Sequence, residues 1–356
     1  MLKARRCVHE MREYHSPLSS ATIDLRLDMN ESTTGCSPRV LAKLNSMDAR
    51  TLALYPRREP GEKLVAEFMG VAAEHILLTN GADEGIDLLC RAYLEPGSEI
   101  VVVTPTFAMY EVFAQTEDAK VVRVPAGPEF SFPIRGVLDA ITPQTRIIVI
   151  CNPNNPTGLA VARSSIMKVI EAAPDAAILL DEAYFDFYGQ TMMDQIGKLP
   201  NLFIARTFSK AYGLAGLRLG VMAGDKEQIS VLRRMVSPFN VNAFAMECLA
   251  EALADREFVN TYVAQVRAGR EWLQSELEQL HFKCWPSQAN FVLCRLGNAK
   301  KAILEALRAR GIALRDRPDC EGCARITVGK QHEMERLIAE LKQVLATIST
   351  APQVAR

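Results

Sequence analysis

The chain has 356 residues, of which 49% are hydrophobic, and its net charge is −1. This length allows a large core and suggests about two domains. Charges of both signs are interspersed, which gives no support to a nucleic-acid partner. No apolar run is long enough to span a bilayer, and no apolar stretch follows the charged start of the chain. We therefore predict neither a membrane segment nor a secretory signal.

Nine cysteines are scattered along the chain without a disulfide framework, which predicts reduced thiols and a cytoplasmic protein. Cys320 and Cys323 form a single C-x-x-C pair. A zinc site needs a second pair, and a redox motif opens a helix after a strand, whereas this pair precedes a predicted strand. We expect two ordinary loop thiols and no metal site.

The first part of the chain predicts an arm and a few short elements. Residues 1–24 are polar and irregular, and 25–27 form a short extended piece. Ser37 followed by Pro38 marks the start of a helix, because serine caps the free N–H groups and proline suits the first turn. Another helix is expected over 62–69.

From residue 76 the pattern alternates between short apolar runs and amphipathic stretches. The apolar runs predict strands at 76–79, 100–103, 120–124, 147–150, 178–180, 202–207 and 217–223. The stretches between them predict helices at 82–94, 107–115, 134–140 and 164–172. Such alternation predicts an α/β fold with a mostly parallel sheet covered by helices on both faces. Sites in these sheets form at the carboxyl ends of the strands.

The remainder of the chain predicts a small α+β unit. Residues 226–280 are mainly helical. Strands are then expected at 281–285, 291–294, 312–314 and 325–328, with helices at 298–310 and 331–348.

Lys210 follows the apolar strand 202–207 and is surrounded by small residues. A lysine that loses hydration there has a lowered pKa, and its neutral amine can attack a carbonyl. Ser209 and Arg218 supply a hydroxyl and a cationic fork that suit a phosphate. The alternative is a surface loop with an ordinary solvated lysine.

Other strand ends also carry polar residues. The turn 152–158, Asn-Pro-Asn-Asn-Pro-Thr-Gly, is stiff enough to fix an amide, or it only reverses the chain. Asp181 is partly desolvated and favours a cationic partner, unless it is a helix cap. Tyr184 follows it, as a site residue or as packing. Ala82 and Asp83 open a helix whose free N–H groups can bind an anion, although many strand–turn–helix units look alike.

Three further residues are candidates for binding. Tyr110, in Pro-Thr-Phe-Ala-Met-Tyr, could stack on a flat ring, although such aromatics are more often core. Arg325 and Arg315 could meet an anion or pair with nearby aspartates. No G-x-G-x-x-G follows a strand, which argues against a nicotinamide-dependent dehydrogenase.

Taken together, these motifs resemble the class I/II (fold-type I) aminotransferases that depend on pyridoxal 5′-phosphate. The resemblance covers about residues 25 to 345 and rests on N-P-N-N-P-T-G, D-E-A-Y, T-F-S-K-A-Y-G-L-A-G-L-R-L-G and R-I-T-V-G. Segments 79–89, 105–110 and 311–316 are most similar to the histidinol-phosphate aminotransferase subfamily. The resemblance implies an N-terminal arm with part of the small domain at 1–48, a large cofactor-binding domain at 49–250 and a small C-terminal domain at 251–356.

The resemblance also implies roles for the residues that match its motifs. Lys210 would bind the cofactor covalently and move the substrate proton, and Asp181 would pair with the protonated ring nitrogen. Asn155 and Tyr184 would bind the ring's phenolic oxygen, and Tyr110 would stack on the ring. The cofactor phosphate would be bound by Ser209, Arg218 and the N–H groups of Ala82 and Asp83.

For the substrate, the resemblance implies Arg325 as the residue that binds its acidic end, with Arg315, Asn155, Asn30 and the arm residue Tyr14 beside it. Tyr55 would reach the cofactor phosphate of a second subunit, which implies a homodimer. The implied reaction is a ping-pong transfer between histidinol phosphate and 2-oxoglutarate or glutamate, in histidine biosynthesis.

Two places depart from the subfamily's pattern. Asn30-Glu31 is followed by Ser-Thr-Thr rather than by proline and an aromatic residue, and Phe107 stands where tyrosine is common. An aromatic amino-acid aminotransferase and a threonine-phosphate decarboxylase of the same family are therefore alternatives. A ligand-sensing regulator with this fold would carry a DNA-binding segment or lack the lysine, and the sequence shows neither feature.

Overall fold

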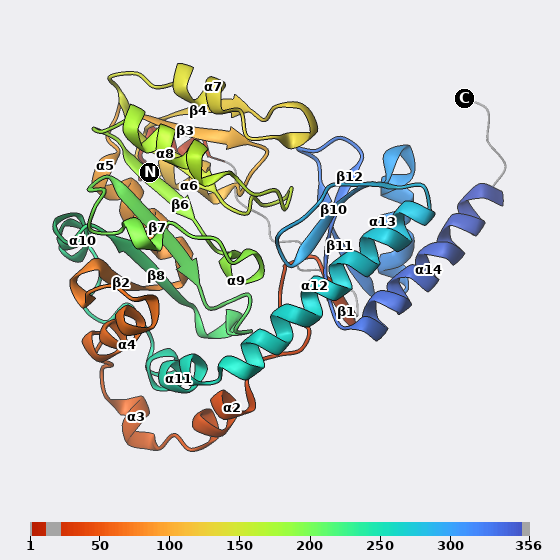
Figure 1. Cartoon of the computed structure of the whole chain (residues 1–356), viewed down its shortest axis with the longest axis horizontal. Coiled ribbons are helices and arrows are strands. Elements are labelled where there is room, and N and C mark those ends of the chain that lie inside the picture. Colours follow the sequence, from red (N-terminus) through yellow and green to blue (C-terminus); the bar gives the residue numbers. More distant parts are fainter. Residues whose placement is uncertain (1, 12–22, 351–356) are drawn as a thin grey trace.

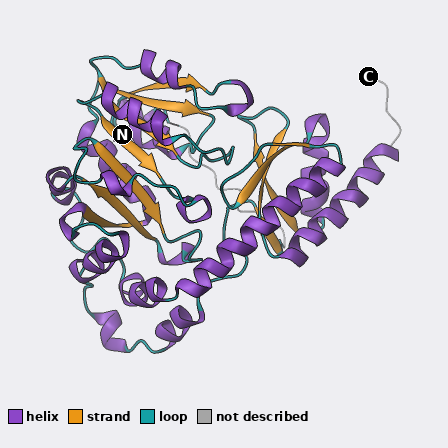
Figure 2. Ribbon diagram, in the orientation of Figure 1, coloured by secondary structure: helices purple, strands orange, loops and turns teal. Residues whose placement is uncertain are grey.

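A computed structural model describes residues 2–11 and 23–350 of the chain. The strands form two sheets, one of seven strands and one of five. Figures 1 and 2 show the larger sheet on one side of the molecule and the smaller sheet on the other. The α/β fold with a mostly parallel sheet and a smaller α+β part is confirmed. The domain limits 1–48, 49–250 and 251–356 remain a prediction.

The large sheet has the strand order β2-β8-β7-β6-β5-β3-β4. Only β8 runs antiparallel to its neighbours, so five of the seven strands lie in a continuous parallel array. Six of the strands follow the predicted apolar runs closely. Those inside the sheet are apolar because both of their faces are buried, whereas the residues of the edge strand β4 are mostly exposed or half-buried. The strands are β2 (Ile76–Asn80), β3 (Glu99–Thr104), β4 (Lys120–Pro125), β5 (Thr145–Cys151), β6 (Ala177–Asp181), β7 (Leu202–Thr207) and β8 (Leu219–Gly224).

Alternate residues of each strand enter two separate apolar cores. On β6, for example, Leu179 packs into one core while Ile178 and Leu180 pack into the other. One core is covered by α5 (Gly81–Tyr93), α6 (Met109–Thr116) and α10 (Lys226–Arg233). The opposite core is covered by α4 (Glu59–Met69), α7 (Ile134–Asp139), α8 (Arg163–Ala172) and α11 (Ala243–Ala254).

The small sheet has the order β1-β11-β12-β10-β9 and joins the two ends of the chain. Its first strand, β1 (Leu25–Leu27), pairs in parallel with β11 (Ile312–Arg317). The others are β9 (Lys283–Cys284), β10 (Phe291–Arg295) and β12 (Cys323–Thr327). Helices α13 (Lys300–Ala309) and α14 (Gln331–Thr350) pack on this part. In Figure 1 the long helix α12 (Arg256–Gln279) runs from beside α11 to the small sheet, so it connects the two parts.

Several short elements differ from the predictions. The arm contains a helical turn, α1 (Arg6–His9), which contacts α6, so this stretch is not wholly irregular. The strand expected at 281–285 is reduced to two residues, because His281 has the positive φ of 62°. Strand β8 begins at residue 219 rather than 217, since Arg218 has a left-handed backbone conformation. Further unpredicted turns are α3 (Ala49–Ala53) and α9 (Phe185–Tyr188), whereas α2 (Pro38–Asn45) begins after the Ser37 cap as expected.

All nine cysteines are free. Cys320 lies in the turn before β12, whereas Cys323 is the first residue of that strand and both are buried, so the expectation of two loop thiols is wrong for Cys323. Within residues 2–11 and 23–350, no cluster of three or more His, Cys, Asp or Glu side chains is placed to bind a metal ion. In the same ranges, none of the helices combines the length and the apolar character that crossing a bilayer requires.

Candidate active site

Polar residues from many segments surround one cavity of about 1180 Å³. The carboxyl ends of β5, β6 and β7 reach it with Cys151, Asp181 and Thr207. The segment after β1 and the strand β11 of the small sheet close its other sides. Sequence-predicted site residues that line the cavity are Asn30, Ala82, Asp83, Asn155, Asp181, Tyr184, Ser209, Lys210, Arg218, Arg315 and Arg325.

Lys210 lies three residues beyond the end of β7 and faces this cavity. Its Nζ donates a hydrogen bond of 3.1 Å to the carbonyl oxygen of Met29. Burial, which is the largest cause, and the positive charge of Arg325 together lower the pKa of Lys210 to about 8. About a tenth of the amine is therefore neutral at pH 7, and this fraction can act as a nucleophile or base.

Asp181 is the last residue of β6 and is almost wholly buried. Its Oδ1 accepts a hydrogen bond from the Ala183 N–H at 2.9 Å, and its Oδ2 accepts one from the Tyr110 hydroxyl at 2.5 Å. Burial raises the pKa of Asp181 to about 6, and the two hydrogen bonds oppose that increase. Among the described residues, no Lys, Arg or His forms an ion pair with it, so the carboxylate is suited to a cationic group in the cavity.

The N-terminus of α5 forms an anion-binding corner with the loop before β8. Gly81 has the positive φ of 79°, and a Cβ atom there would lie 2.4 Å from Nη2 of Arg218. The Arg218 guanidinium thus lies directly against the turn, and it donates to Asp83 Oδ2 at 3.1 Å. Ser209 is buried beside Thr207, whose hydroxyl donates to it at 2.9 Å. Free helix N–H groups, a hydroxyl and a guanidinium together match a phosphate.

Arg325 joins the small sheet to the large one. It lies on β12, is buried, and donates to Asn155 Oδ1 at 2.5 Å and to the carbonyl oxygen of Asp28 at 2.6 Å. Beside it, the Asn30 side-chain amide donates to the Tyr184 hydroxyl at 2.8 Å. These bonds fix a cation, an amide and a phenol against one another at the cavity wall.

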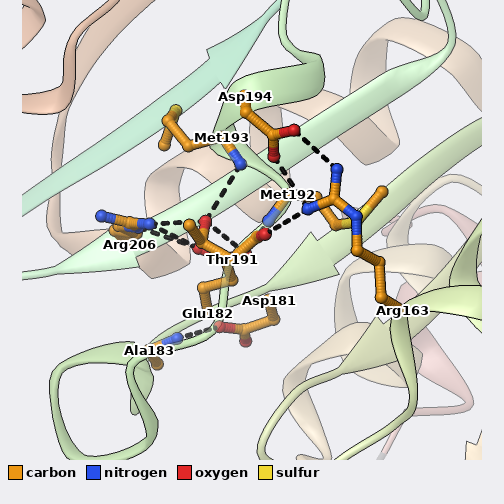
Figure 3. A network of polar contacts seen from close by, with 9 residues as sticks. All are labelled: Arg163, Asp181, Glu182, Ala183, Thr191, Met192, Met193, Asp194 and Arg206. Carbon is orange, nitrogen blue, oxygen red and sulfur yellow. Dashed lines mark hydrogen bonds and ion pairs between the residues drawn. The ribbon is translucent and has the colours of Figure 1, made fainter.

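A second network supports the chain just beyond Asp181, as Figure 3 shows. The buried Glu182 carboxylate accepts hydrogen bonds from Arg206, from the Thr191 hydroxyl and from the Met192 N–H. The Arg206–Glu182 ion pair measures 2.7 Å, and its side chains are 11% and 0% exposed. Because Glu182 adjoins Asp181, this network fixes the backbone that carries the acid into the cavity.

Tyr110 does not line the cavity, so the structure gives no support to its predicted stacking on the cofactor ring. Its side chain is wholly buried below the cavity, and its hydroxyl bonds to Asp181. Phe107 lines the cavity instead, with its ring edge-on to Tyr110 at 5.5 Å between centroids. The cause is local: α6 begins at Met109, so Phe107 lies in the preceding loop and the two rings point to different places.

Two other predicted residues lie apart from the cavity. Tyr55 does not line it; its side chain is 76% exposed and stacks on Phe239 with 4.2 Å between ring centroids. Tyr14 lies outside the described residues. The role of Tyr55 toward a second subunit stays a prediction.

Several cavity residues were missed from the sequence. The Met29 carbonyl is a backbone group, which no motif reveals. Arg317 pairs with Asp319 and also donates to the Thr106 carbonyl oxygen at 3.3 Å, across the gap between the sheets. The sequence contained a signal for this residue, because Arg317 follows Arg315 by two residues and therefore falls on the same face of a strand.

The sequence comparisons identify the family. The family model described as aminotransferase class I and II matches residues 22–341. A histidinol-phosphate aminotransferase of Dehalococcoides mccartyi (strain CBDB1) is 36% identical over 336 residues, which are 92% of each chain. That of Cytophaga hutchinsonii is 37% identical over 294 residues, 81% of this chain and 84% of the relative.

Solved structures share the fold. Histidinol-phosphate aminotransferase from Sinorhizobium meliloti, in complex with pyridoxal-5′-phosphate, superposes with a TM-score of 0.90 at 22% identity, covering 98% of this chain and 99% of that one. L-threonine-O-3-phosphate decarboxylase from Porphyromonas gingivalis superposes with a TM-score of 0.80 at 22% identity, covering 90% and 99%. From the family match and the sequence relatives, we conclude that the chain belongs to the class I and II aminotransferases.

Proposed function

We propose that this aminotransferase moves an amino group between histidinol phosphate and 2-oxoglutarate by a ping-pong sequence, as a step of histidine biosynthesis. The observation that carries the proposal is that Lys210 and Asp181, from different strand ends, line one cavity together with the cations Arg218 and Arg325. The sequence relatives named histidinol-phosphate aminotransferase support the choice of amino donor.

The enzyme uses pyridoxal 5′-phosphate, and the cavity fits that group. The anion-binding corner of Ser209, Arg218 and the α5 N-terminus suits its phosphate, and the unpaired buried carboxylate of Asp181 suits its protonated ring nitrogen. Tyr184 and Asn155 supply polar groups for the phenolic oxygen, and Phe107 supplies a flat apolar face. When bound, the cofactor supplies an electron sink that stabilises negative charge at the substrate carbon.

Side chains of the protein carry out the other parts of the reaction. Lys210, with its lowered pKa, is the nucleophile that holds the cofactor's carbonyl carbon and the base that takes the proton from the substrate carbon. Asp181 keeps the ring nitrogen protonated. Tyr184 has a pKa raised to about 12 by burial, so it acts as a hydrogen-bond donor at neutral pH.

The acidic end of each substrate is assigned to the cations of the small sheet. Arg325 offers a fixed guanidinium at the cavity wall, suited to the carboxylate of glutamate or the phosphate of histidinol phosphate. Arg315 lines the same side of the cavity. Asn30 joins this group through its bond to Tyr184, and Tyr14 is proposed as a further phosphate ligand.

We further propose that the active unit is a homodimer with Tyr55 near the interface. Large apolar side chains are exposed around it, namely Leu52, Leu54 and Phe239, each at least 50% exposed. Such an apolar surface is typical of a contact with another chain. A cytoplasmic location is proposed as well, which the nine free thiols support.

The test is a comparison of kcat/KM for histidinol phosphate, phenylalanine and threonine phosphate with 2-oxoglutarate as acceptor. We expect histidinol phosphate to be preferred at least tenfold. Preference for phenylalanine would identify an aromatic amino-acid aminotransferase, and release of carbon dioxide from threonine phosphate would identify a decarboxylase. Sedimentation of Tyr55→Asp tests the dimer, because a charge in a buried apolar interface should give monomers.

A further inference from the structure

Tyr110 and Asp181 form a buried hydrogen-bonded pair, and Tyr110 has no role in the reaction proposed above. Tyr110 lies in the first turn of α6, where its side chain is 0% exposed. Its hydroxyl oxygen lies 2.5 Å from Oδ2 of Asp181, which is a short hydrogen bond. Burial raises the pKa of Tyr110 well above its usual value, and the charge of Asp181 adds to this. The hydroxyl therefore keeps its proton and is the donor, while the carboxylate is the acceptor.

The pair leaves little freedom to the carboxylate. One oxygen of Asp181 is bonded to the Tyr110 hydroxyl, and the other is bonded to the Ala183 N–H at 2.9 Å. Because both oxygens are hydrogen-bonded, the carboxylate can turn only by breaking a hydrogen bond. The ionisable groups that act on Asp181 from the surrounding elements are Tyr110 on α6, Asp83 on α5, Glu182 after β6, Cys151 on β5 and Tyr184.

We propose that Tyr110 is a positioning residue that keeps Asp181 ionised and aimed at the ring nitrogen of the cofactor, so that the proton of that pair stays on the ring. This rests on the proposed use of Asp181 in the reaction. A donor to the ionised carboxylate stabilises the ionised form, and the bond to Tyr110 lowers the pKa of Asp181 against the effect of burial. Without the donor, the shared proton moves toward the carboxylate and the ring loses positive charge.

The test uses the holoenzyme of Tyr110→Phe, which removes one oxygen and retains the buried ring. The visible absorbance of the cofactor bound at Lys210 changes with pH as the nitrogen of that linkage loses its proton. A less positive ring lets this nitrogen keep its proton to higher pH. We expect the midpoint of the absorbance change to rise by about one pH unit, and kcat to fall about tenfold with the KM of both substrates unchanged.

Two comparisons separate this role from general packing. Tyr93 is the matched control, because its hydroxyl also donates to a side-chain oxygen, Gln228 Oε1 at 2.6 Å, away from the cavity. Tyr93→Phe should leave the absorbance midpoint and kcat unchanged. In the background of Asp181→Asn, the change at Tyr110 should add nothing to the shift, since there is no carboxylate left to stabilise.

A variant that retains a hydrogen-bond donor at position 110 provides a second test of the proposal. Tyr110→His keeps a ring N–H and should recover part of the midpoint and of kcat relative to Tyr110→Phe, which also tests the role if the phenylalanine variant does not fold. An unchanged midpoint in Tyr110→Phe, an equal shift in Tyr93→Phe, or a full additional shift on Asp181→Asn would overturn the proposal. The absorbance titration needs no amino donor, so failure on histidinol phosphate would refute the proposed substrate and not this role.

Discussion

The buried ion pair behind Asp181 allows a sharp prediction about stability. Arg206 and Glu182 lie 2.7 Å apart with 11% and 0% exposed side chains, and the carboxylate has no access to water. Replacing Arg206 by methionine retains an apolar stem over Phe185 but leaves Glu182 charged and unpaired. Breaking a buried pair in this way costs about 3–5 kcal/mol.

The network in Figure 3 also contains an exposed ion pair, which serves as the control. Arg163 and Asp194 lie 2.6 Å apart with 44% and 55% exposed side chains (Figure 3). An exposed pair contributes about 0–1 kcal/mol, because water screens it. With an m value of about 3 kcal/mol/M, Arg206→Met should lower the urea midpoint by about 1–1.7 M and Arg163→Met by less than about 0.3 M.

The assay is urea unfolding of the holoenzyme at neutral pH, followed by tryptophan fluorescence and circular dichroism. Replacing both partners, Arg206→Met with Glu182→Met, should recover most of the lost stability, because no charge then remains buried. Equal midpoint shifts for the buried and the exposed arginine would refute the reasoning, as would a double variant that is less stable than Arg206→Met alone.

Three further predictions concern the site. Gly81→Ala should weaken cofactor binding at least about tenfold, because its φ of 79° is strained for alanine and the new Cβ displaces Arg218. Gly97→Ala is the control and should leave binding unchanged, because Gly97 also has a left-handed φ, of 92°, but a Cβ there meets no atom within 4 Å and the residue does not line the cavity. Fluorescence titration measures both. Burial raises the pKa of Asp186 to about 6, so ionising this carboxyl group destabilises the folded protein as the pH rises from about 4 to about 6. Asp186→Asn should therefore raise the urea midpoint at about pH 8 and leave it unchanged below about pH 4. The rate at which pyridoxal 5′-phosphate attaches covalently to the cofactor-free chain should increase with pH around a midpoint near 8, and absorbance measures this rate. Lys210→Ala should show no attachment; attachment to this variant would contradict the assignment of the lysine.

Much of the site was predictable because parallel strands end at one edge of a sheet. Asp181, Lys210 and Asn155 each follow an apolar run, so the pattern of runs alone placed them together, and the structure brings all three to one cavity. The anion-binding corner was predictable for the same reason, since Ala82 follows a strand and opens a helix.

The features of the site that the sequence did not predict depend on details that apolar patterns do not encode. The resemblance placed Tyr110 on the cofactor ring, but the structure buries Tyr110 outside the cavity, while Phe107, in the loop before α6, lines it. The hydrogen bond from Arg325 to the Asp28 carbonyl spans 297 positions in sequence, and no local signal reports such a contact.

The pairing of β1 with β11 has a consequence for how the enzyme matures. The segment after β1 supplies the carbonyl oxygens that receive Lys210 and Arg325, yet the strand that pairs with β1 lies almost three hundred residues further along the chain. During synthesis the large sheet can therefore form while its cavity still lacks a wall. The coenzyme pocket is completed only when the ribosome has delivered nearly the entire polypeptide, so nascent chains that stall before β11 should emerge structured but unable to retain the coenzyme.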